Sequence, residues 1–127
     1  MKVASLVARY LLGIIFLVFG ANGFLHFIPM QPMPPVATQF VTALAISHYM
    51  VLVFLLQLVG GILLLANRFV PLALTLLAPI IVNIVLTHLL MAPAGLPIAI
   101  LVVILWVLVA ARVWSAFTPL LQQRVES

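Results

Sequence analysis

Long apolar runs constrain the fold of this 127-residue chain more than any other feature. A helix rises about 1.5 Å per residue and needs about 20 residues to cross the hydrocarbon core of a bilayer. Runs of that length are expected at residues 4–27, 49–66, 71–91 and 97–118. The chain is 68% hydrophobic, and a soluble domain of this size could not bury so much apolar surface. Strand alternation is missing, so the pattern predicts transmembrane helices and excludes a barrel.

Prolines place the boundaries between the runs. The prolines from Pro29 to Pro35 end the first run, because each lacks an amide donor and restricts the residue before it. Pro35 can open a short helix at residues 36–47, which we expect to be interfacial or re-entrant, and Pro71 and Pro97 can open the third and fourth spans. The predicted fold is therefore one all-α domain over residues 1–127: a four-helix transmembrane bundle with a short helix between the first and second spans.

The charged residues predict the orientation. The chain has 5 basic and 1 acidic side chains, and the basic ones stand at the ends of apolar runs, not on one soluble face, so nucleic acid is excluded as a partner. With four spans, the positive-inside rule places Lys2, Arg68 and Arg112 on one side of the membrane. We expect a multi-pass protein of a bacterial inner membrane with both termini cytoplasmic. Arg9 and Arg112 are expected to snorkel to lipid headgroups.

Polar side chains within the spans are few, and lipid makes each one costly. The candidate ligand-binding residues, which share the predicted outer half of the bundle, are Asn22, His26, Gln57, Asn83, Thr87 and His88. Pro79, one turn before Asn83, should kink the third span and free the carbonyl of Thr75 as part of a pocket wall. One interpretation is a ligand pocket open to the outer side; the other is that these groups hydrogen-bond between helices and fix their register.

Missing residue types exclude several chemistries. There is no cysteine, which removes disulfides and dithiol redox chemistry. No acid precedes Glu126, so ion-coupled transport lacks its usual intramembrane carboxylate, and no serine shows a hydrolase motif with an acid to orient a histidine. We therefore predict no catalytic residue. The 3 histidines share no helix, so a metal is not expected, whereas a quinone needs only hydrogen bonds from groups such as histidine or asparagine.

Small and aromatic residues are assigned to packing and to the interface. Gly13 and Gly20 share a face of the first span, and Gly60 and Gly61 stand inside the second, which predicts close approach of helices. Aromatic residues such as Trp106 are expected to face lipid or the interface.

Over nearly its whole length the sequence resembles the DoxX-like family of small membrane proteins, through apolar motifs of moderate specificity. The stretch RYLLGIIFLVFGANGF at residues 9–24 resembles the family's opening helix, and QLVGGILLL at residues 57–65 with the following Asn-Arg turn is also similar. The spacing from this second stretch to PIIVN at residues 79–83 and to His88 is also similar to that of the family. The resemblance implies four transmembrane helices and an association with membrane oxidoreductase subunits. The positions matching the family's polar sites are Asn22, Gln57, Asn83 and His88. Many relatives carry an acid where Gln57 stands, so a proton-linked role is not expected here.

Two functions follow as hypotheses. In the first, the chain is a small subunit or accessory of a membrane redox system. Its outer pocket holds a quinone or another amphipathic molecule: His88 and His26 donate to it, Asn22 and Asn83 orient it, and Gln57 closes the floor. In the second, the chain is a scaffold, chaperone or assembly factor whose glycine faces point outward to partner membrane proteins. A homo-oligomer is compatible with either.

Overall fold

The computed structural model describes residues 2–125, and every regular element in that range is helical. Four helices are long and apolar enough to cross a membrane, which is the arrangement of a multi-pass membrane protein and confirms the all-α four-helix fold. The elements are α1 (Lys2–Leu25), α2 (Pro35–Ile46), α3 (Tyr49–Ala66), α4 (Val70–Leu90), the 3-10 turn η1 (Pro93–Gly95), α5 (Leu96–Arg112), and the 3-10 turns η2 (Trp114–Ala116) and η3 (Thr118–Leu121).

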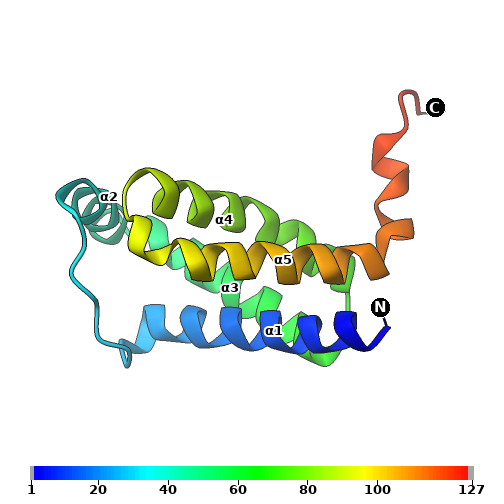
Figure 1. Ribbon diagram of the computed structural model, residues 1–127, viewed down its shortest axis with the longest axis horizontal. Helices are drawn as coiled ribbons and strands as arrows, with labels where there is room; N and C mark the ends of the chain where they lie inside the picture. Colours follow the sequence, from blue (N-terminus) through cyan, green and yellow to red (C-terminus); the bar gives the residue numbers. More distant parts are fainter. Residues whose placement is uncertain (1, 126–127) are drawn as a thin grey trace.

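The four long helices pack as a closed ring. α1 packs most extensively on α3 and also on α5, and α4 packs on both α3 and α5. α2 packs on α3 and lies across one end of the bundle (Figure 1). The start of α1, the α3–α4 turn and the end of α5 meet at the opposite end (Figure 1). We call the half that carries α2 the outer half and the other the inner half, following the predicted orientation.

Two helices end two or more residues earlier than the sequence pattern predicts. α1 stops at Leu25 because His26 adopts a left-handed conformation with φ 53°. α5 stops at Arg112, short of the predicted residue 118, and the chain continues in 3-10 turns that leave the bundle axis (Figure 1). At this end the Val113 N–H bonds to the Ala110 carbonyl oxygen at 3.1 Å, a 3-10 bond that tightens the last turn.

Glycines set the spacing between α1 and α3. A Cβ atom at Gly61 would lie 2.7 Å from the backbone nitrogen of Leu17 and 2.8 Å from the carbonyl oxygen of Gly13. At Gly20 it would lie 3.0 Å from the carbonyl oxygen of Phe54. No other residue fits between these backbones without moving them. The helix-packing interpretation of the glycines is therefore confirmed.

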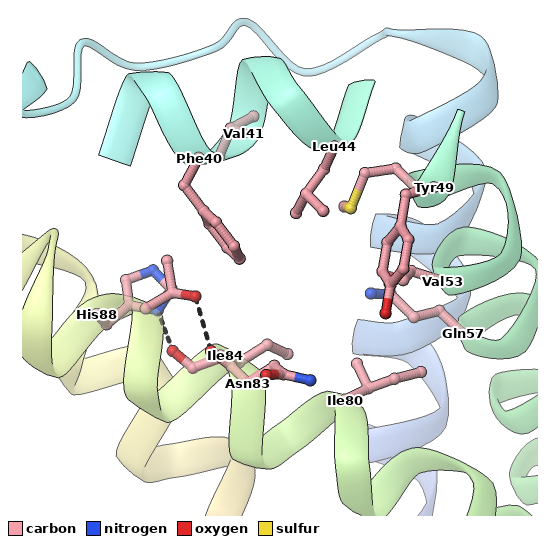
Figure 2. A pocket seen from close by; sticks show the side chains of 12 residues that line it. Phe40, Val41, Leu44, Tyr49, Val53, Gln57, Ile80, Asn83, Ile84 and His88 are labelled. Carbon is pink, nitrogen blue, oxygen red and sulfur yellow. Dashed lines mark hydrogen bonds between the residues drawn. The ribbon is translucent and has the colours of Figure 1, made fainter. Parts of the chain in front are cut away.

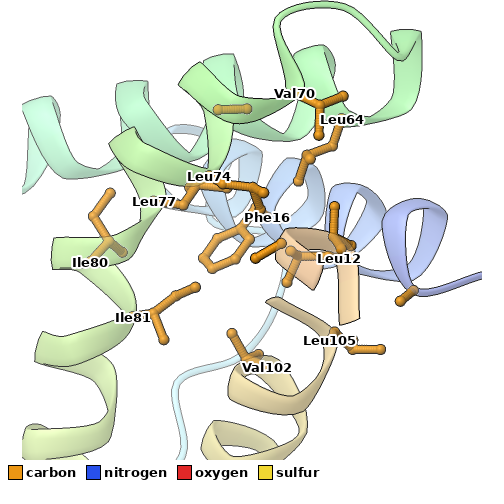
Figure 3. Close-up of a cluster of buried hydrophobic side chains, with 14 residues drawn as sticks. Leu12, Phe16, Leu64, Val70, Leu74, Leu77, Ile80, Ile81, Val102 and Leu105 are labelled. Carbon is orange, nitrogen blue, oxygen red and sulfur yellow. The ribbon is translucent and has the colours of Figure 1, made fainter. Parts of the chain in front are cut away.

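The apolar core fills the inner half and the middle of the bundle (Figure 3). Its largest fully buried side chains are Leu12, Phe16, Leu64, Leu74 and Leu77. On α4 the buried positions all lie between Val70 and Ile81, and no residue from 82 to 90 is buried. The outer half of α4 is therefore available to line a cavity.

Two side-chain hydrogen bonds join helices within the core region. Trp106 donates its Nε1–H to the Leu74 carbonyl oxygen at 3.0 Å and is half-buried, so besides any contact with lipid it joins α5 to α4. Arg9 is only 9% exposed and donates to the carbonyl oxygen of Leu64 near the end of α3. Arg9 therefore does not extend along the outside of the bundle as the snorkelling prediction requires, because its guanidinium turns inward to the last turn of α3.

Candidate ligand-binding site

Two cavities occupy the outer half of the bundle. The lateral cavity, of about 360 Å³, lies between α2, α3 and α4 (Figure 2). The central cavity, of about 280 Å³, lies among α1, α3, α4 and α5. Both are lined mainly by apolar side chains with a few polar groups, as small-molecule sites usually are.

Gln57, Ile84 and His88 line both cavities and so form the partition between them. Gln57 comes from the middle of α3, and Ile84 and His88 are one helical turn apart on α4. A ligand in either cavity therefore meets the same amide and the same imidazole. These side chains are the centre of the candidate site.

Gln57 is the most unusual polar group of the site. It is 7% exposed, and its Oε1 atom is buried without a hydrogen-bond donor among the residues that the structure describes. In Figure 2 its amide nitrogen points into the space between α2, α3 and α4. Leaving a buried polar atom unsatisfied costs about 1–3 kcal/mol. The bundle thus holds a buried amide whose bonding it does not complete.

His88 is oriented by its own helix. Its Nδ1 lies 2.8 Å from the Ile84 carbonyl oxygen, and since a carbonyl can only accept, Nδ1 carries the proton. In the neutral ring Nε2 is then an acceptor. Gly95 makes room for this ring, because a Cβ atom there would lie 1.9 Å from His88 Cδ2. The expectation that a neutral His88 donates to a ligand is corrected, since its one N–H is already used.

Asn83 and Thr87 stand on the face of α4 that lines the lateral cavity. The Thr87 hydroxyl donates to the Asn83 carbonyl oxygen at 2.7 Å, a bond within the helix. The side-chain amide of Asn83 borders the cavity from α4, and its nitrogen points toward Ile80 (Figure 2). The lateral cavity is therefore bordered by two amide groups, those of Asn83 and Gln57.

Asn22 and His26 do not join this cluster as a pair. Asn22 lines the central cavity, but its Oδ1 accepts the backbone N–H of Ile28 at 2.7 Å and its carbonyl accepts that of His26 at 2.8 Å. Asn22 thus ends α1 and keeps only its amide nitrogen for a ligand. His26 is exposed and lines neither cavity, so its predicted placement in the site is wrong. The left-handed turn at His26 takes it off the helical face that it was expected to share with Asn22.

The alternative interpretation, in which the polar groups bond between helices, does not describe their hydrogen bonds. Thr87 and His88 bond to the carbonyl four residues earlier in α4, and Asn22 bonds to the loop that follows α1. Thr75 lines neither cavity, so its carbonyl is not the predicted pocket wall. α4 runs unbroken through Pro79, and the kink stays a prediction.

Residues of α2 and the start of α3, which the pattern of polar residues did not indicate, complete the lateral cavity. Phe40, Val41 and Leu44 of α2 form its roof, and Tyr49 of α3 directs its hydroxyl toward Gln57 (Figure 2). The spacing of 40, 41 and 44 on one helical face is the signal that could have identified the roof. The roof residues are apolar, so they suit an apolar part of a ligand.

The described residues contain no Asp or Glu, and no three of their potential metal ligands gather at one place. The polar groups that line the two cavities are amide donors and acceptors, the hydroxyl groups of Tyr49 and Thr87, and the His88 imidazole. These recognise oxygen atoms and hydroxyl groups within an otherwise apolar enclosure.

Comparisons with models of known families, with curated proteins and with solved structures return no match. The DoxX-like resemblance and the functions that it implies therefore stay predictions.

Proposed function

We propose that this chain is an inner-membrane protein that binds a quinone or a chemically similar amphipathic molecule in the lateral cavity, as a small accessory of a membrane redox system. The observation that carries the proposal is the buried Gln57 amide, which lines both cavities and has an unpartnered Oε1. A polar group that the fold leaves incompletely bonded is a natural contact for a ligand.

The amides suit both redox forms of a quinone. Quinone carbonyl oxygens can accept from the side-chain nitrogens of Gln57 and Asn83. A quinol hydroxyl can donate to Nε2 of His88. It can also donate to Oε1 of Gln57 if the side-chain amide rotates by about 180° and exchanges the positions of its oxygen and nitrogen. A carboxylate at position 57 would offer only acceptors when ionised.

The apolar tail of such a molecule fits the remaining wall. Phe40, Val41 and Leu44 cover the cavity from α2, and Val53 and Ile80 border it from α3 and α4. A ring placed between the amides would leave its tail against these side chains. The link to a redox system and the bacterial inner-membrane location with cytoplasmic termini rest on the DoxX-like resemblance and on the positive-inside pattern.

The scaffold alternative gains no support from the glycines. Gly13, Gly20 and Gly61 face the α1–α3 contact, and Gly60 faces Leu77 of α4. The glycine surfaces on which a partner was expected to dock are thus used within the bundle.

Binding of decylubiquinone and of its reduced form to the purified full chain in neutral detergent tests the proposal. Calorimetric titration under anaerobic conditions should give saturable binding of both forms. Gln57→Leu should raise the dissociation constant roughly three- to tenfold, the effect of one lost hydrogen bond. Gln39→Leu is the matched control, because Gln39 is exposed on α2 and lines neither cavity. No saturable binding to the wild type, or equal affinities for the two variants, would refute the proposal.

A further inference from the structure

A third hollow lies at the inner end of the bundle, away from the proposed ligand site. It has a volume of about 270 Å³ and is lined by the first turns of α1, the α3–α4 turn, the start of α4 and the end of α5. Three of its lining side chains are cationic: Lys2, Arg9 and Arg112. Ser5 and Asn67 add a hydroxyl and an amide.

Arg9 is the buried member of this cluster. One of its guanidinium nitrogens donates to the Leu64 carbonyl oxygen. The guanidinium carbon lies 4.6 Å from the centroid of the Tyr10 ring, within range of a cation–π contact. A guanidinium carries several more N–H donors, so one carbonyl does not complete its bonding. Arg9 also lines the hollow, which leaves this space for the remaining donors.

The described part of the chain supplies no negative charge to this cluster. The sequence has 1 acidic residue, Glu126, which lies outside the described residues. A cation that is nine-tenths buried is costly unless a counter-charge is close. Three cations around one hollow therefore call for an anion.

We propose that the inner hollow binds a phosphate group, supplied in the membrane by the headgroup of an anionic phospholipid. The planar guanidiniums of Arg9 and Arg112 match the geometry of phosphate oxygens, and Lys2 adds a mobile point charge. The hollow lies at the ends of the candidate spans, where headgroup phosphates are found, and basic pockets between transmembrane helices are suited to such headgroups. This site is independent of the quinone proposal.

Native mass spectrometry of the full chain in neutral detergent tests the inference. The probes are dioleoyl phosphatidylglycerol, dioleoyl phosphatidylcholine with the same acyl chains, and inorganic phosphate. The wild type should bind the first phosphatidylglycerol molecule in preference to phosphatidylcholine. Binding of inorganic phosphate without a preference for phosphatidylglycerol would identify free phosphate as the source. A preference for phosphatidylglycerol without binding of inorganic phosphate would identify the lipid. Either result supports phosphate recognition by the hollow.

Variants at the exposed cations assign the effect to the hollow. Lys2→Gln and Arg112→Gln should each lower the phosphatidylglycerol preference about fivefold, since each cation near the surface contributes about that factor. Both residues are exposed, so these variants avoid the folding risk of replacing buried Arg9. Arg68→Gln is the matched control. Arg68 is a cation at the same end of the bundle, on the α3–α4 turn, but its side chain does not line the hollow.

Two outcomes would overturn the inference. One is equal binding of the two lipids by the wild type together with no effect of inorganic phosphate. The other is a loss in Arg68→Gln as large as in Lys2→Gln and Arg112→Gln, which would mean that net charge and not the hollow attracts the anion.

Discussion

In the inner half of the bundle, Leu12, Leu64 and Leu74 are fully buried and the backbones of α1 and α3 nearly touch at Gly61. In the outer half these helices, together with α2, border two cavities, and α4 buries no residue beyond Ile81. Both halves are highly apolar in sequence, so hydrophobicity does not explain the difference. What differs is the packing of α4, which buries Leu77 beside Gly60 but no side chain beyond Ile81, whereas α1 and α3 stay close at Gly20 as well.

The comparison of the two halves assigns stability mainly to the inner half and ligand binding to the outer half. Within a bilayer there is little hydrophobic drive between helices, so close packing supplies much of the cohesion. The inner half provides that packing. The outer half keeps a buried amide at Gln57 that a more stable bundle would replace, which is a trade-off expected of a functional site.

The largest effect should come from shortening a fully buried side chain in the core. Leu77→Ala should lower the free energy of unfolding by about 2–5 kcal/mol, through lost contacts and a new cavity beside Gly60. Leu44→Ala, in the roof of the lateral cavity, should cost clearly less because that side chain already borders empty space. Unfolding by sodium dodecyl sulfate in neutral micelles measures both. Equal losses would mean that the two halves contribute alike.

A smaller effect is expected from adding one methyl group to a glycine. Gly61→Ala should cost about 1–3 kcal/mol, since the new Cβ meets backbone atoms of α1 that cannot move aside. Gly23→Ala is the outer-half counterpart, where the new Cβ would lie 2.2 Å from Cγ of the Phe54 side chain and not against backbone. Phe54 borders the central cavity, so we expect a change of its rotamer to accommodate the methyl group at a lower cost. The same unfolding titration compares them. A cost at Gly23 equal to that at Gly61 would contradict the idea that the outer half is loosely packed.

The smallest effect should be a gain in stability. Gln57→Leu removes an unsatisfied buried oxygen and keeps a side chain of similar size, so the ligand-free protein should become more stable by about 1 kcal/mol. Gln57→Glu is the informative companion, because a carboxyl group buried there would have only the His88 imidazole as a basic neighbour among the cavity-lining residues and should destabilise the bundle when ionised. Thermal unfolding without ligand measures both. A loss of stability in Gln57→Leu would show that the amide is structural.

The sequence alone determined the class of fold. Four apolar runs of spanning length, bounded by Pro35, Pro71 and Pro97, can satisfy their backbones in lipid only as helices, and this physical constraint does not depend on contacts between them. The glycines also predicted close packing, because a missing side chain matters wherever helices meet.

The tertiary structure decided which polar groups share a site. Gln57 and His88 lie in the partition between the cavities, while His26 leaves the helix through a left-handed turn and Asn22 bonds to the following loop. Arg9 turned inward because the Leu64 carbonyl lies within its reach. Such outcomes depend on helix rotation, on the last residue of each helix and on the position of a neighbouring carbonyl. Hydropathy and spacing carry none of this information, since they give the depth of a residue in the membrane but not the direction in which its side chain points.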